Sequence, residues 1–290
     1  MFWNVENFFD PWDDPSKNDD DFTSRGRNAW TFKRFETKCN SIAKTILSAG
    51  GEYGEYPVIV GLAEVENDFV LKHLTEQTPL FKLEYGFIHL ESPDLRGIDV
   101  ALLYRKNDFK PIDIETVRVD IPDGNPTRDI LYVCGVLNEN DTIHVFVNHW
   151  PSKLGGEEAS RPRREAASDA LKSKLRELGP DDRIIIMGDF NDTNPFTDSL
   201  VRQMNVVKDG TIKFQGVWDQ IDYFFVSENL YEESSFTPYS PDFLIEEDKT
   251  YLGIKPRRTY IGPRYNGGVS DHFPIILKIF FLPLPKHRTL

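Results

Sequence analysis

Polar side chains that can bind a cation or move a proton recur in this sequence at the ends of apolar, strand-like runs, either just after a run or just before it. A carboxylate follows VIVGLA, an imidazole follows IHVFVN, and a carboxylate and an amide follow IIIMG. One polar residue at a strand end is usually a turn or cap. As a set, carboxylates and amides suit Mg²⁺ or Mn²⁺, and imidazoles suit phosphate binding or proton transfer. The set is Asn4, Glu64, His149, Asp189, Asn191, Asp222, Asp271 and His272.

The segment IIIMGDFND, residues 184–192, shows this pattern most clearly. Alternate side chains of an extended segment point to the same side. We therefore expect Asp189 and Asn191 to share a face, from which both address one attacking water or a metal-bound phosphate.

Strand-like and helix-like patterns alternate along the chain and must position these residues. The predicted strands are 1–5, 57–62, 85–89, 99–104, 130–137, 142–148, 183–187, 221–226 and 274–281, and the predicted helices are 31–48, 67–74 and 161–178. Neighbouring strands without a helix between them, as in 130–148, indicate antiparallel pairs. The pattern favours an α/β fold of two packed mixed sheets flanked by helices over a parallel Rossmann sheet. Without an internal repeat or a Gly/Ser linker, we expect one domain over residues 1–290.

Composition narrows the setting further. The net charge of −13 argues against a protein that holds nucleic acid by bulk electrostatics, but not against an enzyme that contacts phosphate briefly. No apolar run reaches the roughly 18 residues of a membrane span, so we expect a soluble chain without stable membrane insertion. Cys39 and Cys134 are the only cysteines, which makes a disulfide framework unexpected.

Six motifs resemble the ordered series of the endonuclease/exonuclease/phosphatase superfamily, which includes pancreatic-type deoxyribonucleases, abasic-site endonucleases, neutral sphingomyelinases and inositol polyphosphate 5-phosphatases. The motifs are WNVEN (3–7), GLAEVEN (61–67), NHWPS (148–152), GDFND (188–192), QIDYFFVS (220–227) and SDHFPI (270–275). They span nearly the whole chain in the expected order, and with TRDIL and the acidic loop they look like a bacterial branch. The resemblance implies a four-layered α/β sandwich fold. It also implies an enzyme that hydrolyses a phosphate ester with the help of Mg²⁺ or Mn²⁺.

The resemblance also implies roles for the metal-binding and substrate-binding residues. Glu64 is the principal metal ligand, Asn4 helps to bind metal or phosphate, and Asp271 assists the metal. Arg128, in PTRDIL, is a basic residue expected to face the substrate.

The same resemblance implies the catalytic roles. Asp189 orients and deprotonates the attacking water, and Asn191 holds that water and contacts substrate. His149 and His272 donate to phosphate oxygens. Asp222 is the acidic partner of His272, and such a pair raises the pKa of the imidazole, which then acts as a donor rather than a base.

Three features keep two interpretations each. The acidic segment 10–22 suits a second cation or a solvated loop. Arg161, Arg163 and Arg164 suit a phosphate clamp or an ordinary helix surface. Asp99 suits a partner for His149 or an edge-strand carboxylate.

The leading hypothesis is a Mg²⁺- or Mn²⁺-dependent phosphodiesterase, with nucleic acid as the expected substrate. A phosphatase or a phospholipase C-like hydrolase of a small or lipid phosphate is the enzyme alternative, and a scaffold protein on the same fold is the non-enzyme alternative. We expect a monomer. Localisation is not readable, because an upstream secretion signal would lie outside a sequence whose first strand is short.

Overall fold

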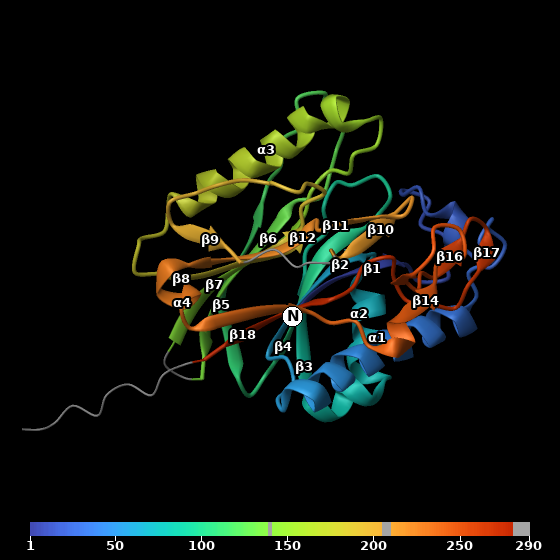
Figure 1. Cartoon of the computed structure of the whole chain (residues 1–290), viewed down its shortest axis with the longest axis horizontal. Coiled ribbons are helices and arrows are strands. Elements are labelled where there is room, and N and C mark those ends of the chain that lie inside the picture. Colours follow the sequence, from blue (N-terminus) through green and yellow to red (C-terminus); the bar gives the residue numbers. More distant parts are fainter. Residues whose placement is uncertain (139–140, 205–209, 281–290) are drawn as a thin grey trace, which may run out of the picture.

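The computed structural model describes residues 1–138, 141–204 and 210–280, and two six-stranded sheets dominate it (Figure 1). The first sheet has the order β13-β18-β1-β2-β4-β3 and the second has the order β5-β6-β7-β8-β12-β9. The first contains β1 (Phe2–Phe8), β2 (Ile59–Val65), β3 (Tyr85–His89), β4 (Asp99–Arg105), β13 (Ser234–Pro238) and β18 (Ile275–Ile279). The second contains β5 (Phe109–Val117), β6 (Ile130–Leu137), β7 (Asp141–His149), β8 (Arg183–Asp189), β9 (Val201–Gln203) and β12 (Asp222–Ser227).

Helices and small hairpins complete the described chain. The helices are α1 (Phe32–Tyr53), α2 (Asp68–Glu76), α3 (Glu157–Leu175) and α4 (Glu228–Tyr231), with short 3-10 turns at Asp20–Phe22, Pro79–Leu83 and Asp242–Leu244. The hairpins pair β10 (Ile212–Phe214) with β11 (Val217–Asp219), β14 (Ile245–Glu247) with β15 (Ile254–Pro256), and β16 (Tyr260–Ile261) with β17 (Arg264–Tyr265).

Both sheets are mixed, which confirms the predicted sheet type. In the first sheet β1 runs parallel to β2 and antiparallel to β18. In the second sheet β7 runs parallel to β8, which is antiparallel to β12. Mixed pairing lets strands that are distant in sequence end at the same rim.

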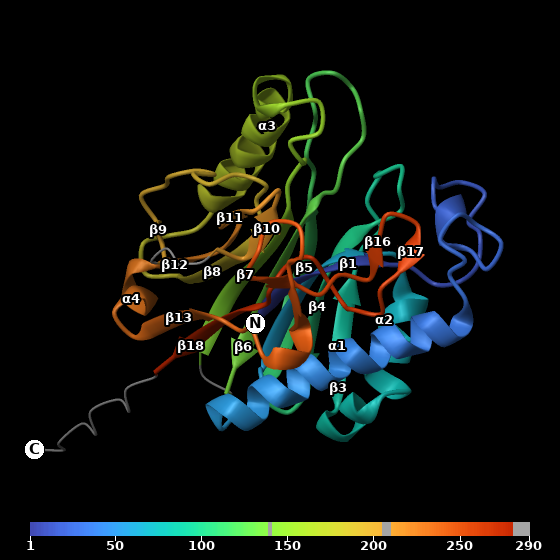
Figure 2. The same cartoon turned by 45° about the vertical axis from the view of Figure 1, so that its right-hand side comes forward.

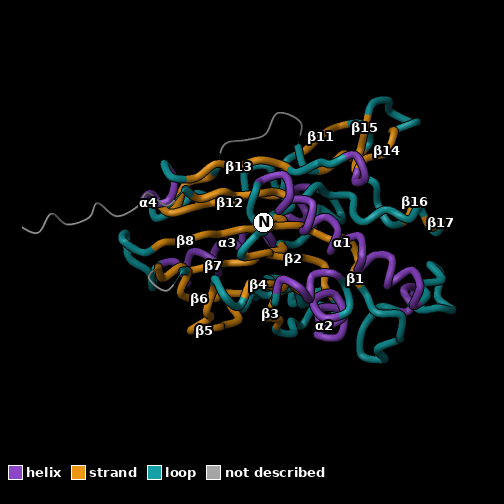
Figure 3. Tube along the Cα trace, turned by 90° about the horizontal axis from the view of Figure 1, so that it is seen from below, coloured by secondary structure: helices purple, strands orange, loops and turns teal. Residues whose placement is uncertain are grey.

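Three apolar cores separate four layers. One lies between α1, α2 and the first sheet, one between the two sheets, and one between the second sheet and α3. Figures 1 and 2 show α1 and α2 on one side of the strands and α3 on the other, and Figure 3 shows the strands from below. The four-layered sandwich expected from the motif series is therefore confirmed.

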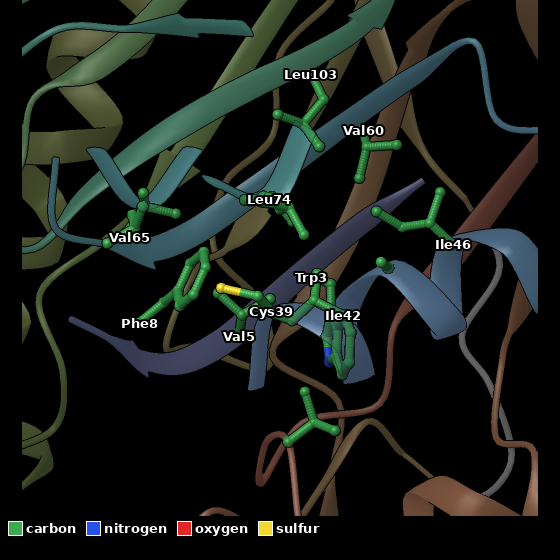
Figure 4. Close-up of a cluster of buried hydrophobic side chains, with 14 of the residues drawn as sticks. Trp3, Val5, Phe8, Cys39, Ile42, Ile46, Val60, Val65, Leu74 and Leu103 are labelled. Carbon is green, nitrogen blue, oxygen red and sulfur yellow. The ribbon is translucent and has the colours of Figure 1, made fainter. Parts of the chain in front are cut away.

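Helix α1 shows how the sequence builds the first layer. Thr31 caps its start by accepting a hydrogen bond from the Arg34 amide at 3.4 Å, and Gly54 ends it with a left-handed φ of 83°. Cys39, Ile42 and other residues spaced by three or four are buried against Trp3 and its neighbours on the first sheet (Figure 4). The apolar periodicity thus placed this helix correctly, although α1 continues five residues beyond the predicted end, Ser48.

Some predicted boundaries were wrong. Helix α3 begins at Glu157 rather than Arg161, and Pro162 lies inside the helix instead of in its first turn. Strand β5 was not predicted, because it is an edge strand with mostly exposed side chains and an irregular register near Pro111. Strand β18 ends at Ile279, and residue 281 of the predicted strand lies outside the described residues.

Across the described ranges, no helix is both long and apolar enough to cross a membrane. Cys39 and Cys134 are both free thiols.

Candidate active site

The candidate residues lie at strand ends of both sheets. In the second sheet, the parallel pairing of β7 with β8 sets His149 opposite Asp189, and β12 sets Asp222 opposite Asp189. In the first sheet, Asn4 of β1 lies opposite Ala63 of β2. The Asn4 amide Nδ2 donates to Asp189 Oδ2 at 2.9 Å, a hydrogen bond that joins the two sheets. Packing of the sheets therefore brings residues from far apart in the sequence to one rim.

Gly188 permits β7 and β8 to approach closely just before Asp189. A Cβ atom at this position would lie only 2.6 Å from the carbonyl oxygen of Asn148. Any side chain would push the two strands apart beside the site. The glycine of IIIMGDFND is thus required by the distance between strands.

A bulge turns the Glu64 side chain toward this rim. The pairing of β2 with β4 shifts between Ala63 and Val65, and Glu64 has a left-handed φ of 63°. Such a conformation costs a non-glycine residue about 1–3 kcal/mol, so it persists only where surrounding contacts hold it. Here the Glu64 carboxylate accepts hydrogen bonds from the Asn7 amide at 2.7 Å and from Asn4 Nδ2 at 3.3 Å.

Asn4 presents a donor to the two carboxylates. Its Nδ2 contacts Glu64 and Asp189, while its Oδ1 accepts from the Glu6 amide at 2.9 Å. An amide nitrogen donates hydrogen bonds and does not ligate a hard cation. This orientation favours a role for Asn4 toward phosphate and carboxylate oxygens over its expected role as a metal ligand.

His272 lies between two carboxylates. Its Nδ1 is 2.8 Å from Asp222 Oδ2, and its Nε2 is 3.7 Å from Asp189 Oδ2. Burial opposes protonation of the imidazole, but Asp222 and Asp189 outweigh it and raise the pKa of His272 well above the ordinary value. The Thr211 hydroxyl donates to the same Asp222 oxygen, and Ser270 Oγ accepts from the His272 amide at 3.0 Å. The expected contact of Asp222 with His272 is therefore present.

His149 has the opposite electrostatic character. Its Nε2 is 3.8 Å from Asp189 Oδ2 and 4.0 Å from Glu64 Oε1. Burial lowers the pKa of His149 well below the ordinary value, and the cations of Arg128 and Arg96 lower it further. Nδ1 is buried and makes no hydrogen bond within the described chain. The pKa values of the two imidazoles are therefore shifted in opposite directions.

Asp189 is the carboxylate that these groups share. Burial raises the pKa of Asp189 to about 7, and the charge of Asp222 adds to this rise, whereas His272 and Asn4 oppose it. A bound divalent cation would lower this pKa again. A carboxylate with a pKa near neutrality is suited to accept a proton from water.

The premise about Asn191 was wrong. Strand β8 ends at Asp189, and Asn191 has a left-handed φ of 51° in the following turn, so alternation along a strand does not relate the two side chains. Instead, the Asn191 backbone amide donates to Asp189 Oδ1 at 3.0 Å, and its side-chain amide donates to the Trp150 carbonyl at 2.9 Å. The contact of Asn191 with Asp189 is therefore made by its backbone amide and not by its side chain.

Arg128 ties loops together behind the site. Its guanidinium contacts Asp94 Oδ2 at 3.2 Å and the Trp150 carbonyl at 3.0 Å, the same carbonyl that Asn191 uses. Its side chain is 9% exposed. This geometry favours a positioning role over the substrate contact expected from the sequence.

The arginines at the start of α3 are occupied by ion pairs. Arg161 contacts Glu158 at 2.8 Å, and Arg163 contacts Asp123. Arg164 is buried and contacts Asp192 at 2.9 Å. These ion pairs do not form a free phosphate clamp, which was one of the two interpretations of this cluster.

Two other expectations have a structural outcome. Asp99 bonds Ser92 and lies 3.3 Å from Nε2 of His89, whose Nδ1 faces Asp68, so Asp99 pairs with a different histidine from His149. In the acidic segment 10–22, no group of three possible ligand side chains converges among the described residues. Two such groups lie elsewhere in the described chain, one at His89, Glu91 and Asp99 and one at Asp189, Asp222 and His272.

Several groups of the site were not predicted. Arg96 Nη2 donates to Asn7 Oδ1 at 2.6 Å and lies 3.7 Å from Glu64 Oε2. Arg258 contacts both Glu6 and Asp271. Glu6 lies within the motif WNVEN, so the sequence could have pointed to it. Arg96 and Arg258 belong to none of the six motifs, so the sequence did not distinguish them from the other arginines.

The geometry describes a buried acid–base site on a double-sheet sandwich. The sequence model of the Endonuclease/Exonuclease/phosphatase family matches residues 1–209 and 200–280. The chain belongs to this family, whose members are hydrolases that act on phosphate esters.

Solved structures share the fold at low sequence identity. Truncated TDP2 from Caenorhabditis elegans is 17% identical with a TM-score of 0.59, covering 87% of this chain and 93% of that one. The Bacteroides thetaiotaomicron mannosyl-6-phosphatase Bt3783 is 17% identical with a TM-score of 0.56, covering 84% and 91%. The human Nocturnin catalytic domain is 16% identical with a TM-score of 0.52, covering 83% and 84%. No curated protein matches the sequence significantly.

Proposed function

We propose that this protein is a divalent-metal-dependent phosphoesterase in which Asp189 activates the attacking water. One observation carries the proposal: Asp189 Oδ2 accepts a hydrogen bond from Asn4 at 2.9 Å and has a nitrogen of each histidine within 3.8 Å. The contrasting pKa shifts of His149 and His272 supply a fixed positive charge and a neutral donor around one base.

The residues present fit a hard divalent cation. Glu64 offers a carboxylate whose Oε1 lies 3.3 Å from Asn4 Nδ2 and 4.0 Å from His149 Nε2, on the side of the site that faces Asp189. Carboxylate oxygens are the ligands that Mg²⁺ and Mn²⁺ prefer. A cation held at Glu64 would polarise the phosphate and neutralise charge that develops during the reaction.

The remaining steps use groups of the chain and solvent. Asp189 takes a proton from the attacking water as the new P–O bond forms, the ester P–O bond breaks, and the departing oxygen takes a proton from solvent and leaves as an alcohol. The His272 imidazolium and the Asn4 amide donate to phosphate oxygens, where negative charge grows in the transition state. Asp222, 2.8 Å from His272 Nδ1, raises the pKa of His272 and so favours the imidazolium.

A small phosphate ester is the substrate class that the charges favour. Arg161, Arg163 and Arg164, for which a phosphate clamp was one of two interpretations, are paired with acidic side chains, and the net charge is −13. The name of Bt3783 records a sugar-phosphate activity for that fold relative. Nucleic acid remains the second candidate, because Arg96 and Arg258 leave about half of their side chains exposed beside Glu64 and Asp271.

A substrate panel tests the proposal. Purified protein is incubated with hexose phosphates, inositol phosphates, a chromogenic phosphodiester and plasmid DNA, each with Mg²⁺, Mn²⁺ or a chelator. We expect metal-dependent turnover that is lost in Asp189→Asn, with sugar or inositol phosphates preferred. Turnover of DNA alone would make the enzyme a nuclease, and turnover of no phosphate ester would support the scaffold alternative.

A further inference from the structure

Arg258 occupies the space between two carboxylates at the rim of the site. Its Nη2 lies 2.7 Å from Glu6 Oε1 and 3.1 Å from Asp271 Oδ2, and its Nε donates to Glu6 Oε1 at 3.0 Å. Asp271 Oδ1 in turn lies 4.0 Å from Nε2 of His272. The guanidinium therefore bridges an acid of β1 and the acid that precedes His272.

This bridge is firmly built on the Glu6 side. The Glu6 side chain is 5% exposed, and its Oε2 accepts from the Thr259 amide at 2.9 Å. The buried Lys38 donates to the Glu6 carbonyl, to Thr259 Oγ1 at 2.8 Å and to the Val269 carbonyl at 3.0 Å. Lys38 thus fastens the segment that carries Arg258 to β1, which fixes the guanidinium in place.

The Glu6 and Asp271 carboxylates face each other across one cation, the Arg258 guanidinium. The two carboxylates both lie within 3.1 Å of Nη2, and a divalent ion at that position could also bind an oxygen of each. An ion could enter only by displacing the guanidinium, because Nη2 contacts an oxygen of each acid.

We propose that Arg258 is a permanent cation in the place of a second divalent ion, so that the site binds one divalent cation and Asp271 is not its ligand. The statement rests on the proposed function, because it takes Glu64 as the position of that one cation. It replaces the expectation that Asp271 assists the metal. It also gives the rim beside His272 a positive charge that does not vary with metal concentration.

Isothermal titration with Mn²⁺ at neutral pH tests the stoichiometry. We expect the wild type to bind one ion, Arg258→Ala to bind two, and Arg258→Ala/Asp271→Asn to bind one again. Arg257→Ala is the matched control, because its guanidinium contacts the Asn266 carbonyl instead of an acid, and it should bind one ion. An equal number of ions in wild type and folded Arg258→Ala would overturn the proposal.

A second variant keeps the test valid if Arg258→Ala does not fold. Asp271→Asn in the wild-type background should leave Mn²⁺ stoichiometry and affinity unchanged, whereas loss of an ion or a tenfold weaker affinity would make Asp271 a ligand and overturn the proposal. Failure of the proposed function looks different. A wild type that binds no Mn²⁺, with one ion gained in Arg258→Ala, would support the role of Arg258 and reject Glu64 as the metal position.

Discussion

His272 Nδ1 lies 2.8 Å from Asp222 Oδ2, while Nε2 of the same ring lies 3.7 Å from Asp189 Oδ2. The His272 imidazole thus connects Asp222, which raises the pKa of the ring, with Asp189, the proposed base. Because Asp222 lies on β12 and His272 precedes β18, the connection also joins the two sheets.

Replacing Asp222 by Asn should lower the pKa of His272, because the negative charge of Asp222 stabilises the imidazolium in the wild type. With less of the protonated donor, kcat should fall by about 10²-fold, and Mn²⁺ affinity should hardly change. Some activity should return as the pH is lowered, until Asp189 is protonated. pH–rate profiles and NMR titration of His272 would measure both effects. Asp219→Asn is the matched control for a nearby half-buried acid. Metal binding lost in proportion to activity would instead make Asp222 a metal ligand.

Glu64→Gln should weaken Mn²⁺ binding by at least about tenfold, because a charged oxygen ligand becomes a neutral one. The Gln side chain still offers an oxygen to the Asn7 amide, so the thermal midpoint should hardly change. Calorimetry with Mn²⁺ and a thermal melt give the two readings. The exposed Glu52→Gln on α1 is the control, and unchanged affinity in Glu64→Gln would remove Glu64 from the metal site.

Glu66→Gln should stabilise the protein at pH 8 by about 1 kcal/mol or more and have little effect at pH 4.5. Burial, with nearby Asp10, Asp14 and Asp19, raises the pKa of Glu66 to about 9. Between pH 4.5 and 9 the folded state keeps a proton that the unfolded state has released, so stability falls as the pH rises through this window. Gln has no proton to release, and its oxygen can still accept from the Asp10 amide.

Denaturant unfolding of wild type and Glu66→Gln at both pH values would check the sign, with the exposed Glu36→Gln as control. Loss of stability at pH 8 in Glu66→Gln would mean that Glu66 is ionised and held by a cation in the folded protein.

Arg164→Ala should destabilise the fold by about 2 kcal/mol or more, because a 3% exposed guanidinium bonds Asp192, Ser160 and Glu157. Arg161→Ala should change stability by less than about 0.5 kcal/mol, because its pair with Glu158 is exposed. Urea midpoints compare the two variants directly. Equal losses of stability in the two variants would contradict the structural role of Arg164, and a change confined to KM for DNA would assign Arg164 to substrate binding.

The sequence alone determined the sandwich and most of its elements. Apolar periodicity is a local property, so it located α1 and the central strands, and the motifs at the ends of those strands named Glu64, His149, Asp189, Asp222 and His272. It did not locate β5, because an exposed edge strand with an irregular register lacks the apolar pattern.

Tertiary structure decided how those residues act. The two histidines look alike in sequence, but carboxylates on other strands charge His272, while burial keeps His149 neutral. Likewise, the sequence does not distinguish Arg164 and Arg258 from the other arginines. The fold buries Arg164 in an ion pair with Asp192 and places Arg258 between Glu6 and Asp271. Electrostatic character depends on distances across the fold, and the spacing of residues along a chain does not contain those distances.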